Sequence, residues 1–320
     1  MKRERGVALI TVLLVVALVS VVCTGLLLRQ QLAIRSTGNQ LLVRQALYYA
    51  EGGELLAKAI LLRDLRANDT AVPIDHLGEQ WANPRLSFPL DEGGDLTLRI
   101  SDLAGRFNLN RLAVGGQEAE LELQRLRRLL QLLELPPTYA DRLLDWLDRD
   151  QDASGSEGAE DAEYLLLQPP YRTGPGLIAD VSELRLLLGM KEEEYRRLQP
   201  FVSALPREVK LNVNTASAQV LASLSAGVAP QSLDALLAMQ RRGGIAQEQF
   251  QQLLGAQSPV EGVVFSSQYF QVTSEVRLGD RRQVLVSTLQ RGNDGRVRVT
   301  ARDLGQAGIV PALANKESEQ

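Results

Sequence analysis

Residues 1–28 read MKRERGVALITVLLVVALVSVVCTGLLL, a charged leader followed by a run from Val7 to Leu28 that carries no charge. At about 1.5 Å per residue, a helix over Val7–Leu28 is about 33 Å long, enough to cross the roughly 30 Å hydrocarbon core of a bilayer. Lys2, Arg3 and Arg5 precede this run, and the rest of the 320-residue chain follows it. The positive-inside rule then predicts a leader in the cytoplasm and an exported remainder.

The composition limits the functions open to the chain. Its formal net charge of −4, from 35 basic and 39 acidic residues, argues against a nucleic-acid-binding protein. Cys23 is the only cysteine and lies in the apolar run, so no internal disulfide can form. We therefore expect packing or a metal ion to stabilise the exported part. A single histidine and no glycine-rich phosphate loop predict a protein that is not an enzyme and has no small-molecule substrate.

The junction between leader and apolar run carries a candidate processing site. A secretory signal is cut after its apolar region at a small-residue site, but here the chain continues as Arg29-Gln-Gln-Leu32. Gly6, directly before the run, resembles instead the site in type IV prepilin signals. That resemblance implies that a prepilin peptidase cuts after Gly6 and leaves Val7 as the methylated first residue. An uncleaved signal anchor is the alternative.

Thr11 distinguishes this apolar run from those of most pilins and pseudopilins. It is the fifth residue counted from Val7, a position where most of those proteins have Glu. A carboxylate in hydrocarbon is costly unless it is paired, and in pilus assembly it is thought to pair with the terminal amine of a neighbour. A subunit without it suits the tip of a filament, and the pattern resembles the K subunit of type II secretion systems. An ordinary helix residue is the plainer interpretation.

Periodicity divides the remaining chain into helices and strands. An apolar stripe at three- and four-residue steps continues the first helix to about Arg66, through Leu42, Ala46, Tyr49, Gly53, Leu56 and Ile60. Asp95–Ser101 alternates polar and apolar residues, as half-buried strands do. Further strands are predicted only near the C-terminus, at Phe265–Leu278, Arg281–Arg291 and Arg296–Arg302, and the chain between Leu103 and Gly262 is mostly helical.

These elements predict an α+β fold of the pilin type. A long N-terminal transmembrane helix would pack on a head built around an antiparallel sheet, with a large all-α domain inserted after the first strand. The predicted division is a leader (1–6), a transmembrane segment (7–28), the remaining helix with the first strand (29–102), the inserted domain (103–262), the C-terminal strands (263–303) and a disordered tail (304–320).

A dense acidic segment in the inserted domain is the candidate metal site. Asp150-x-Asp152-x-Ser154-Gly, with Asp161 further on, spaces its oxygens like an EF-hand loop. So many carboxylates repel each other unless a hard cation or full solvation relieves them, and calcium prefers oxygen ligands. A solvated acidic loop is the alternative. The predicted ligands for one or two calcium ions are Asp148, Asp150, Asp152, Ser154, Glu160, Asp161 and Glu163.

Two Asn-x-Asn segments, Asn108-Leu-Asn110 and Asn212-Val-Asn214, lie before helical stretches. The second resembles the start of a helix-hairpin-helix module, with Asn214 or Thr215 as the helix cap. Some such modules bind DNA phosphates, so a membrane-anchored DNA receptor of the competence type is an alternative function. Few basic residues lie nearby, however, and binding of the DNA backbone normally needs more. We therefore interpret the module as helical packing and expect no nucleic-acid partner.

The resemblance to protein K of type II secretion systems extends along most of the chain. It is clearest at Gly6, Val7 and Thr11 and between Trp146 and Tyr171. It implies a minor pseudopilin in the inner membrane, spanning it once, with most of the chain in the periplasm. The implied partners are the I- and J-type minor pseudopilins, the major pseudopilin and the prepilin peptidase, and the implied role is to prime pseudopilus assembly at the tip. In that family two calcium ions hold the loop of the inserted domain. A generic calcium-binding signal-anchor protein remains a third possibility.

Overall fold

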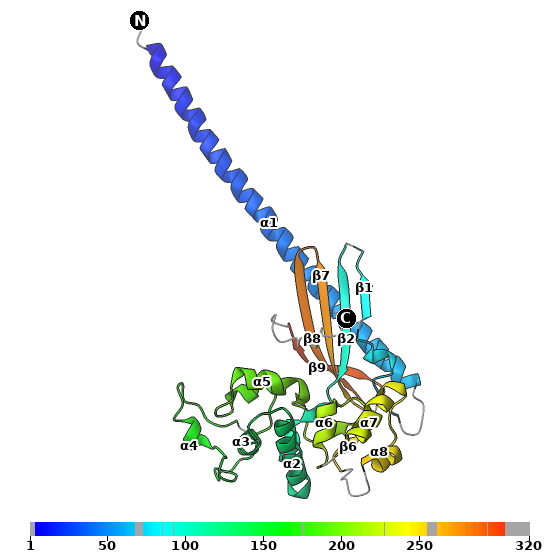
Figure 1. The fold of residues 1–320 in the computed structure, drawn as a ribbon. Coiled ribbons are helices and arrows are strands. Elements are labelled where there is room, and N and C mark those ends of the chain that lie inside the picture. Colours follow the sequence, from blue (N-terminus) through cyan, green and yellow to red (C-terminus); the bar gives the residue numbers. More distant parts are fainter. Residues whose placement is uncertain are drawn as a thin grey trace.

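The computed structural model describes residues 4–67, 73–84, 86–91, 93–174, 176–226, 228–254, 261–292 and 294–304. One long helix runs from the N-terminus onto a sheet, and a mostly helical domain lies beyond the sheet (Figure 1). We call the sheet with the later half of the helix the head, and residues 103–262 the insert. The predicted disordered tail lies, beyond Leu304, outside the described residues.

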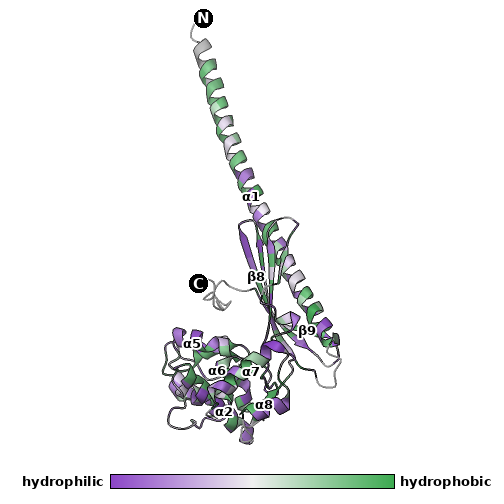
Figure 2. Ribbon diagram, turned by 45° about the vertical axis from the view of Figure 1, so that its right-hand side comes forward, coloured by the Kyte–Doolittle hydropathy of each residue, from purple (hydrophilic) through white to green (hydrophobic). Residues whose placement is uncertain are grey.

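Helix α1 spans Glu4–Ala67 and links the apolar run to the head. It is the one helix among the described residues that is long and apolar enough to cross a membrane. Figure 2 shows its first half as mostly hydrophobic and free of contacts with the rest of the chain. The helix continues without a break through Gly38 and through the Gly52-Gly53 pair. The prediction of one long helix is therefore confirmed.

The head contains a five-stranded antiparallel sheet in the order β1-β2-β7-β8-β9. The strands are β1 (Leu86–Pro89), β2 (Asp95–Asp102), β7 (Tyr269–Leu278), β8 (Arg281–Arg291) and β9 (Val297–Asp303). The predicted strands are confirmed within a few residues. Strand β1 was missed, because proline and glycine on both sides made this stretch look like a loop. The insert therefore follows the second strand of the sheet and not, as predicted, the first.

One face of the sheet packs against the predicted stripe of α1. Alanines dominate the buried positions of this helix face, which lets the helix lie close to the strands. A Cβ atom at Gly53 would lie only 2.7 Å from the Ser274 hydroxyl oxygen, so glycine is needed at this approach. The buried side chains of this core include Ala46, Ala50, Ala57, Leu61, Leu98, Ile100, Phe270, Val272, Val276, Leu285 and Leu289.

The insert leaves the sheet after β2 and returns at β7, and these strands are direct neighbours, with Asp102 opposite Phe270. It has a large core of its own, separate from those of the head. Its helices are α2 (Gly116–Leu132), α3 (Thr138–Leu147), α4 (Asp161–Tyr164), α5 (Glu192–Leu198), α6 (Ala218–Ser223), α7 (Pro230–Arg242) and α8 (Gln247–Leu254). Its short strands are β3 (Phe107–Asn108), β4 (Val202–Ser203), β5 (Leu211–Asn212) and β6 (Val263–Val264).

Four short 3₁₀ helices complete the described elements. The first, η1 (Gln80–Ala82), lies in the head and places the buried Trp81 beside Phe270, with their ring centroids 5.2 Å apart. The other three belong to the insert, as η2 (Leu109–Val114), η3 (Val181–Leu186) and η4 (Gln199–Phe201).

The insert consists of two modules that close in the same way. In the first, β3 pairs in parallel with β4, and the buried Asn110 follows β3. The Asn110 amide nitrogen donates to the carbonyl oxygens of Ile178 and Leu205, each at 2.9 Å, while its oxygen accepts from the Ile178 amide at 2.8 Å. One side chain therefore satisfies three buried backbone groups from distant parts of the chain.

Asn214 repeats this arrangement in the second module, where β5 pairs in parallel with β6. Its amide nitrogen donates to the carbonyl oxygens of Ile245 (3.2 Å) and Phe265 (3.3 Å), and its oxygen accepts from the Ile245 amide at 2.7 Å. The helix cap predicted at Asn214 or Thr215 is wrong. Ser217 caps α6 instead, because the Asn214 side chain is used in closing the module.

Candidate functional site

A group of three carboxylates gathers at one end of the insert. Asp145 and Asp148 belong to the end of α3, three residues apart and so on one helix face, and Glu160 begins α4. One oxygen from each lies within 4.8 Å of the others. Asp145 and Glu160 are buried and Asp148 is half-buried. Residues from both ends of the loop 149–159 thus meet below it.

Asp145 fixes the loop that brings Glu160 to this position. Its two carboxylate oxygens accept hydrogen bonds from the backbone amides of Ser154 (2.9 Å) and Ala159 (2.7 Å). These bonds fold the acidic loop back over the helix end. Arg142, one helical turn before, donates to the Glu157 carbonyl oxygen at 3.2 Å and holds the outer part of the loop.

The other two carboxylates of the group are incompletely bonded. Within the part of the chain that the structure describes, Asp148 Oδ1 and Glu160 Oε1 are buried and have no hydrogen-bond partner. Burial, together with the charges of Asp145 and Asp150, raises the pKa of Asp148 to about 6. Burial and the neighbouring carboxylates raise the pKa of Glu160 to about 7. Both groups therefore resist ionisation unless something positive lies between them.

A hard divalent cation fits this donor set. The group offers carboxylate oxygens alone, which suits calcium better than zinc. Two of these oxygens are buried with no partner among the described residues. A bound cation would satisfy both, and it would offset the burial and the repulsion that raise the two pKa values. Asp145, Asp148 and Glu160 are the residues placed to hold it.

The structure brings together two of the seven predicted ligands, Asp148 and Glu160, and adds Asp145. Asp161 is used elsewhere: its carboxylate accepts from Arg172 at 2.8 Å and from the Thr173 amide and hydroxyl at 3.0 Å. Glu163 closes a capping box by accepting from the Glu160 amide at 2.9 Å. The remaining three, Asp150, Asp152 and Ser154, lie in the covering loop outside the group.

The EF-hand spacing therefore does not describe the carboxylate group. EF-hand ligands come from one loop, whereas Asp145 and Asp148 come from the end of a helix. The acidic segment of the sequence contained Asp145, and its position three residues before Asp148 was the signal that could have identified it.

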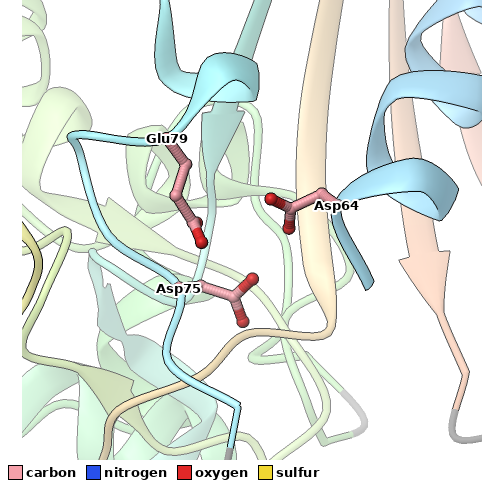
Figure 3. Close-up of side chains that lie close together, drawn as sticks. All are labelled: Asp64, Asp75 and Glu79. Carbon is pink, nitrogen blue, oxygen red and sulfur yellow. The ribbon is translucent and has the colours of Figure 1, made fainter. Parts of the chain in front are cut away.

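Asp64, Asp75 and Glu79 form a second carboxylate group, in the head (Figure 3). Here the positive charge comes from a guanidinium group, in the place that a metal ion would take. Arg291 on β8 pairs with Asp75 and lies 3.1 Å from the Asp64 carboxylate, and it also donates to the Ser267 carbonyl oxygen at 2.8 Å. Glu79 accepts from the Trp81 indole at 2.6 Å. This group is therefore an ion-pair network rather than a metal site.

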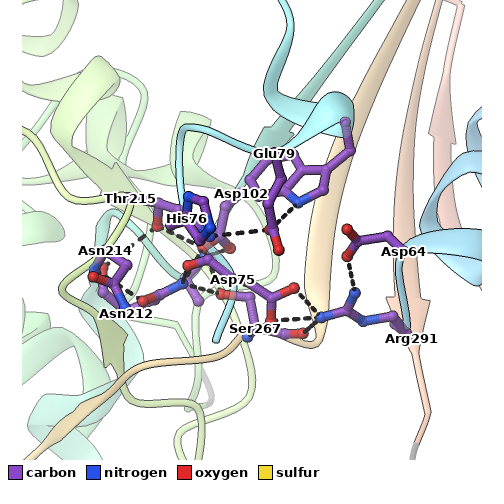
Figure 4. A network of polar contacts seen from close by, with 12 residues as sticks. Asp64, Asp75, His76, Glu79, Asp102, Asn212, Asn214, Thr215, Ser267 and Arg291 are labelled. Carbon is purple, nitrogen blue, oxygen red and sulfur yellow. Dashed lines mark hydrogen bonds and ion pairs between the residues drawn. The ribbon is translucent and has the colours of Figure 1, made fainter. Parts of the chain in front are cut away.

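The network continues into the insert (Figure 4). The Asn212 amide nitrogen donates to the Asp75 carbonyl oxygen at 3.1 Å and to the Asp102 carboxylate at 3.0 Å. Asp102, buried at the end of β2, also accepts from Thr215 at 2.6 Å and from the Ser267 hydroxyl. We call this whole network, including Asp64 on α1 and Arg291 on β8, the joint, because it connects α1, the sheet and the second module.

The predicted membrane residues lie on α1. Gly6 and Val7 belong to its first turns, and nothing further is described for their side chains. Thr11 is exposed, and its hydroxyl donates to the Ala8 carbonyl oxygen at 2.9 Å, a bond within the helix itself. This residue therefore needs no partner from another chain to satisfy its hydroxyl.

Comparison with known proteins identifies the family. Two family models, both described as type II secretion system protein K, match residues 105–207 and 211–273. The type II secretion system protein K of Pseudomonas aeruginosa is 53% identical over 326 aligned positions, covering 99% of this chain and 98% of that protein. The protein K of Aeromonas hydrophila is 32% identical and covers 96% and 98%.

A solved structure has the same fold. It is a chain of the GspK-GspI-GspJ complex from the type 2 secretion system of enterotoxigenic Escherichia coli, 26% identical, with a TM-score of 0.68. The match covers 85% of this chain and 99% of that chain. The alternative function, a membrane-anchored DNA receptor, is not supported, because the proposed DNA-binding module lies within the second protein K match.

The joint predicts a pH-dependent effect of Asp64→Asn. Burial and the charges of Glu79 and Asp75 raise the pKa of Asp64 from 3.8 to about 6. The folded state therefore binds this proton more tightly than the unfolded state, so stability falls as the pH rises from about 4 to about 6 and stays lowered above that. The variant should raise the free energy of unfolding by about 2 kcal/mol at pH 7.5, with no gain near pH 4.

Urea unfolding of the chain from Arg29 onward, at both pH values, measures this difference. Asp280→Asn, at a carboxylate that is 81% exposed, is the control and should change nothing. A variant less stable than the parent at both pH values would show that the ion pair of Asp64 with Arg291 outweighs the cost of its burial.

Proposed function

This chain belongs to the protein K family of type II secretion systems and is a minor pseudopilin, and we propose that it joins I- and J-type minor pseudopilins at the tip of the pseudopilus. The observation that carries the proposal is the fold shared with a protein K chain in a complex with its I and J subunits, over 99% of that chain. In this position it would prime assembly and support protein export across the outer membrane.

The position of the insert supports a place at the tip. It lies at the end of the molecule farthest from the apolar segment of α1 (Figure 1). A further subunit stacked above this chain would meet the bulk of the insert rather than an open helix end. Thr11 supports the same place, because it offers no carboxylate to a subunit above. The major pseudopilin would lie below.

The membrane arrangement follows from α1. We infer that its apolar segment crosses the inner membrane once and that the head and insert lie in the periplasm, as the basic leader predicts. As a structural subunit, the chain needs no catalytic centre.

We also infer processing by a prepilin peptidase after Gly6. In cells with an active peptidase, the chain recovered from membranes should begin at Val7 with a methylated amine. Intact-mass and N-terminal peptide spectrometry measure this. A chain that keeps Met1 in those cells, while another pseudopilin is processed, would establish an uncleaved signal anchor.

The proposed partners predict a complex between soluble portions. The chain from Arg29 onward, mixed with the corresponding portions of the I and J subunits, should elute as one species containing all three in size-exclusion chromatography with light scattering. The major pseudopilin portion in place of I and J serves as the specificity control. Separate elution of this chain under conditions in which I and J bind each other would overturn the proposal.

The carboxylate group in the insert gives the chain its proposed cofactor. We propose that Asp145, Asp148 and Glu160 hold a calcium ion that stabilises the acidic loop. Calcium supplies the positive charge that lets all three carboxylates ionise together. Because the pKa of Glu160 is raised to about 7, protons compete with the ion, and stabilisation by calcium should weaken as the pH falls below about 7.

Thermal unfolding with calcium and with chelator tests this site. A site at one hundred times its dissociation constant adds about 2.7 kcal/mol to the folded state. Glu160→Gln should remove that gain, because it keeps the capping interactions of α4 but loses a charge. With chelator, the variant should be more stable than the parent at pH 8, because the parent must ionise a carboxyl whose pKa is about 7.

Asp152→Asn is the matched control, since Asp152 is exposed, belongs to the same loop and lies outside the carboxylate group. It should keep the full stabilisation by calcium. If Asp152→Asn removes the gain and Glu160→Gln does not, calcium is bound by the loop residues of the EF-hand spacing and not by the carboxylate group.

A further inference from the structure

The insert is attached to the head by two chain segments that lie side by side. The chain leaves β2 at Asp102 and returns at Tyr269, and the Leu103 amide donates to the Tyr269 carbonyl oxygen at 2.9 Å. Head and insert have separate cores, and one small apolar cluster around Leu103, Leu205 and Tyr269 touches both. Because domains move relative to each other unless a large hydrophobic interface holds them, other contacts must fix the angle of the insert.

The joint is the polar contact that fixes this angle. It combines residues from α1, segment 73–79, the end of β2, β8 and the second module (Figure 4). Asp102, buried at the first connection, accepts from the Ser267 hydroxyl at the second. It also accepts from Thr215 at 2.6 Å and from Asn212 at 3.0 Å, both in the second module. One carboxylate therefore bonds both connections and the module that they carry.

At the centre of the joint, three carboxylates gather around one guanidinium. Arg291 forms ion pairs with both Asp64 and Asp75, whose side chains are only 13% and 1% exposed. Glu79 lies close enough to raise the pKa of both carboxyls. These negative charges repel each other in a space that water hardly reaches, and the repulsion is relieved when one carboxyl holds a proton.

The other charged and titratable groups described at the joint lie around this centre. Asp102 is on the side of the second module, and burial raises its pKa. Arg106 is close enough to Asp102 for their charges to attract each other. His76 donates from its backbone amide to Glu79 at 3.1 Å, and its ring accepts from a backbone amide two residues further on. The charges that act directly on Asp64 are those of Arg291 and of the two carboxylates named with it.

We propose that the joint is a proton-operated lock, in which Asp64 sets how firmly the insert is held on the head. With Asp64 protonated, Arg291 pairs with Asp75 alone and the joint stays closed. With Asp64 ionised, two carboxylates compete for one guanidinium, and entry of water into the joint becomes more favourable. The angle between α1 and the insert then varies more. This inference goes beyond the proposed function and does not depend on its partners.

The direction of the effect follows from Asp64. Its pKa is raised from 3.8 to about 6 in the closed joint, and water that enters an open joint removes the burial that raises it. The closed joint therefore binds this proton more tightly than the open joint. Its advantage is greatest in acid and falls as the pH rises through about 6. Between pH 5 and pH 7.5, the ratio of open to closed joints should increase about tenfold.

Hydrogen–deuterium exchange of the full chain in detergent micelles, read by mass spectrometry, tests the lock. The Ser267 amide donates to the Asp75 carboxylate at 2.6 Å, and the Asp75 amide donates to the Phe265 carbonyl oxygen at 3.0 Å. Peptides that contain these two amides report opening of the joint. After correction for the intrinsic exchange rate at each pH, they should exchange about tenfold faster at pH 7.5 than at pH 5. Peptides from α2, inside the first module, should not differ.

Asp64→Asn tests whether this carboxyl operates the lock. An amide has the shape of the protonated carboxyl and cannot ionise, so the joint peptides of the variant should exchange equally slowly at both pH values. Asp280→Asn, at a carboxylate of the head that is 81% exposed, is the matched control and should keep the tenfold difference. A purely structural role of Asp64 would change exchange by the same factor at both pH values.

Three results would overturn the proposal. Equal protection of the joint peptides at both pH values in the parent chain would show that the joint does not respond to protons. Faster exchange at pH 7.5 in α2 as well would show that the insert unfolds as a whole. A tenfold difference that persists in Asp64→Asn would assign the proton to another group. None of these results involves the I and J subunits, so the proposed function is tested separately.

Discussion

The ion pair between Arg291 and Asp75 lies at the centre of the joint, on the side of the head that meets the insert. Their side chains are 5% and 1% exposed, so both charges have left water, at a cost that attraction alone does not always offset. The Ser267 amide donates to the Asp75 carboxylate, and Arg291 donates to the Ser267 carbonyl oxygen. From the insert, the Asn212 side chain donates to the backbone carbonyl oxygen of Asp75. Removing either charge would leave the other buried and unpaired, at a cost of about 3–5 kcal/mol. The orientation of the insert on the head therefore depends on this network of buried hydrogen bonds and ion pairs, whose groups have all their partners in one arrangement only.

The same principle operates inside the insert, where Asn110 and Asn214 each close a module. Each side-chain amide is buried and forms hydrogen bonds with three backbone groups from distant segments. Buried backbone groups of loops need hydrogen-bond partners, and these two side chains supply them. The matching bonds in the two modules indicate that the insert is built from one arrangement used twice.

Much of this fold could be predicted from the sequence, because its strongest patterns are long. Strands β2, β7, β8 and β9 alternate clearly, and α1 has a continuous apolar stripe. Strand β1 has only four residues and ends at Pro89, too short for alternation to stand out. Its pairing with β2 is a tertiary contact that no local pattern carries.

In the candidate metal site, the structure gathers Asp148 and Glu160 of the predicted ligands together with Asp145, which was not among them. Ligand spacing describes a single loop, whereas the carboxylate group joins the end of α3 to the start of α4. Only the bonds from Ser154 and Ala159 to Asp145 bring those ends together.

The place where the insert joins the sheet also has a consequence for the order of folding. Strands β2 and β7 are hydrogen-bonded neighbours, yet roughly 165 residues separate them in the chain. Pairing them while the insert is unfolded would close a very long loop, at an entropic cost of about 5 kcal/mol. Once the insert has folded around its own core, its two ends already lie close together, and β2 can then pair with β7 without closing a long loop. Completion of the sheet is therefore kinetically coupled to the maturation of the insert, so a nascent chain with a defective insert would expose its unpaired strands to aggregation.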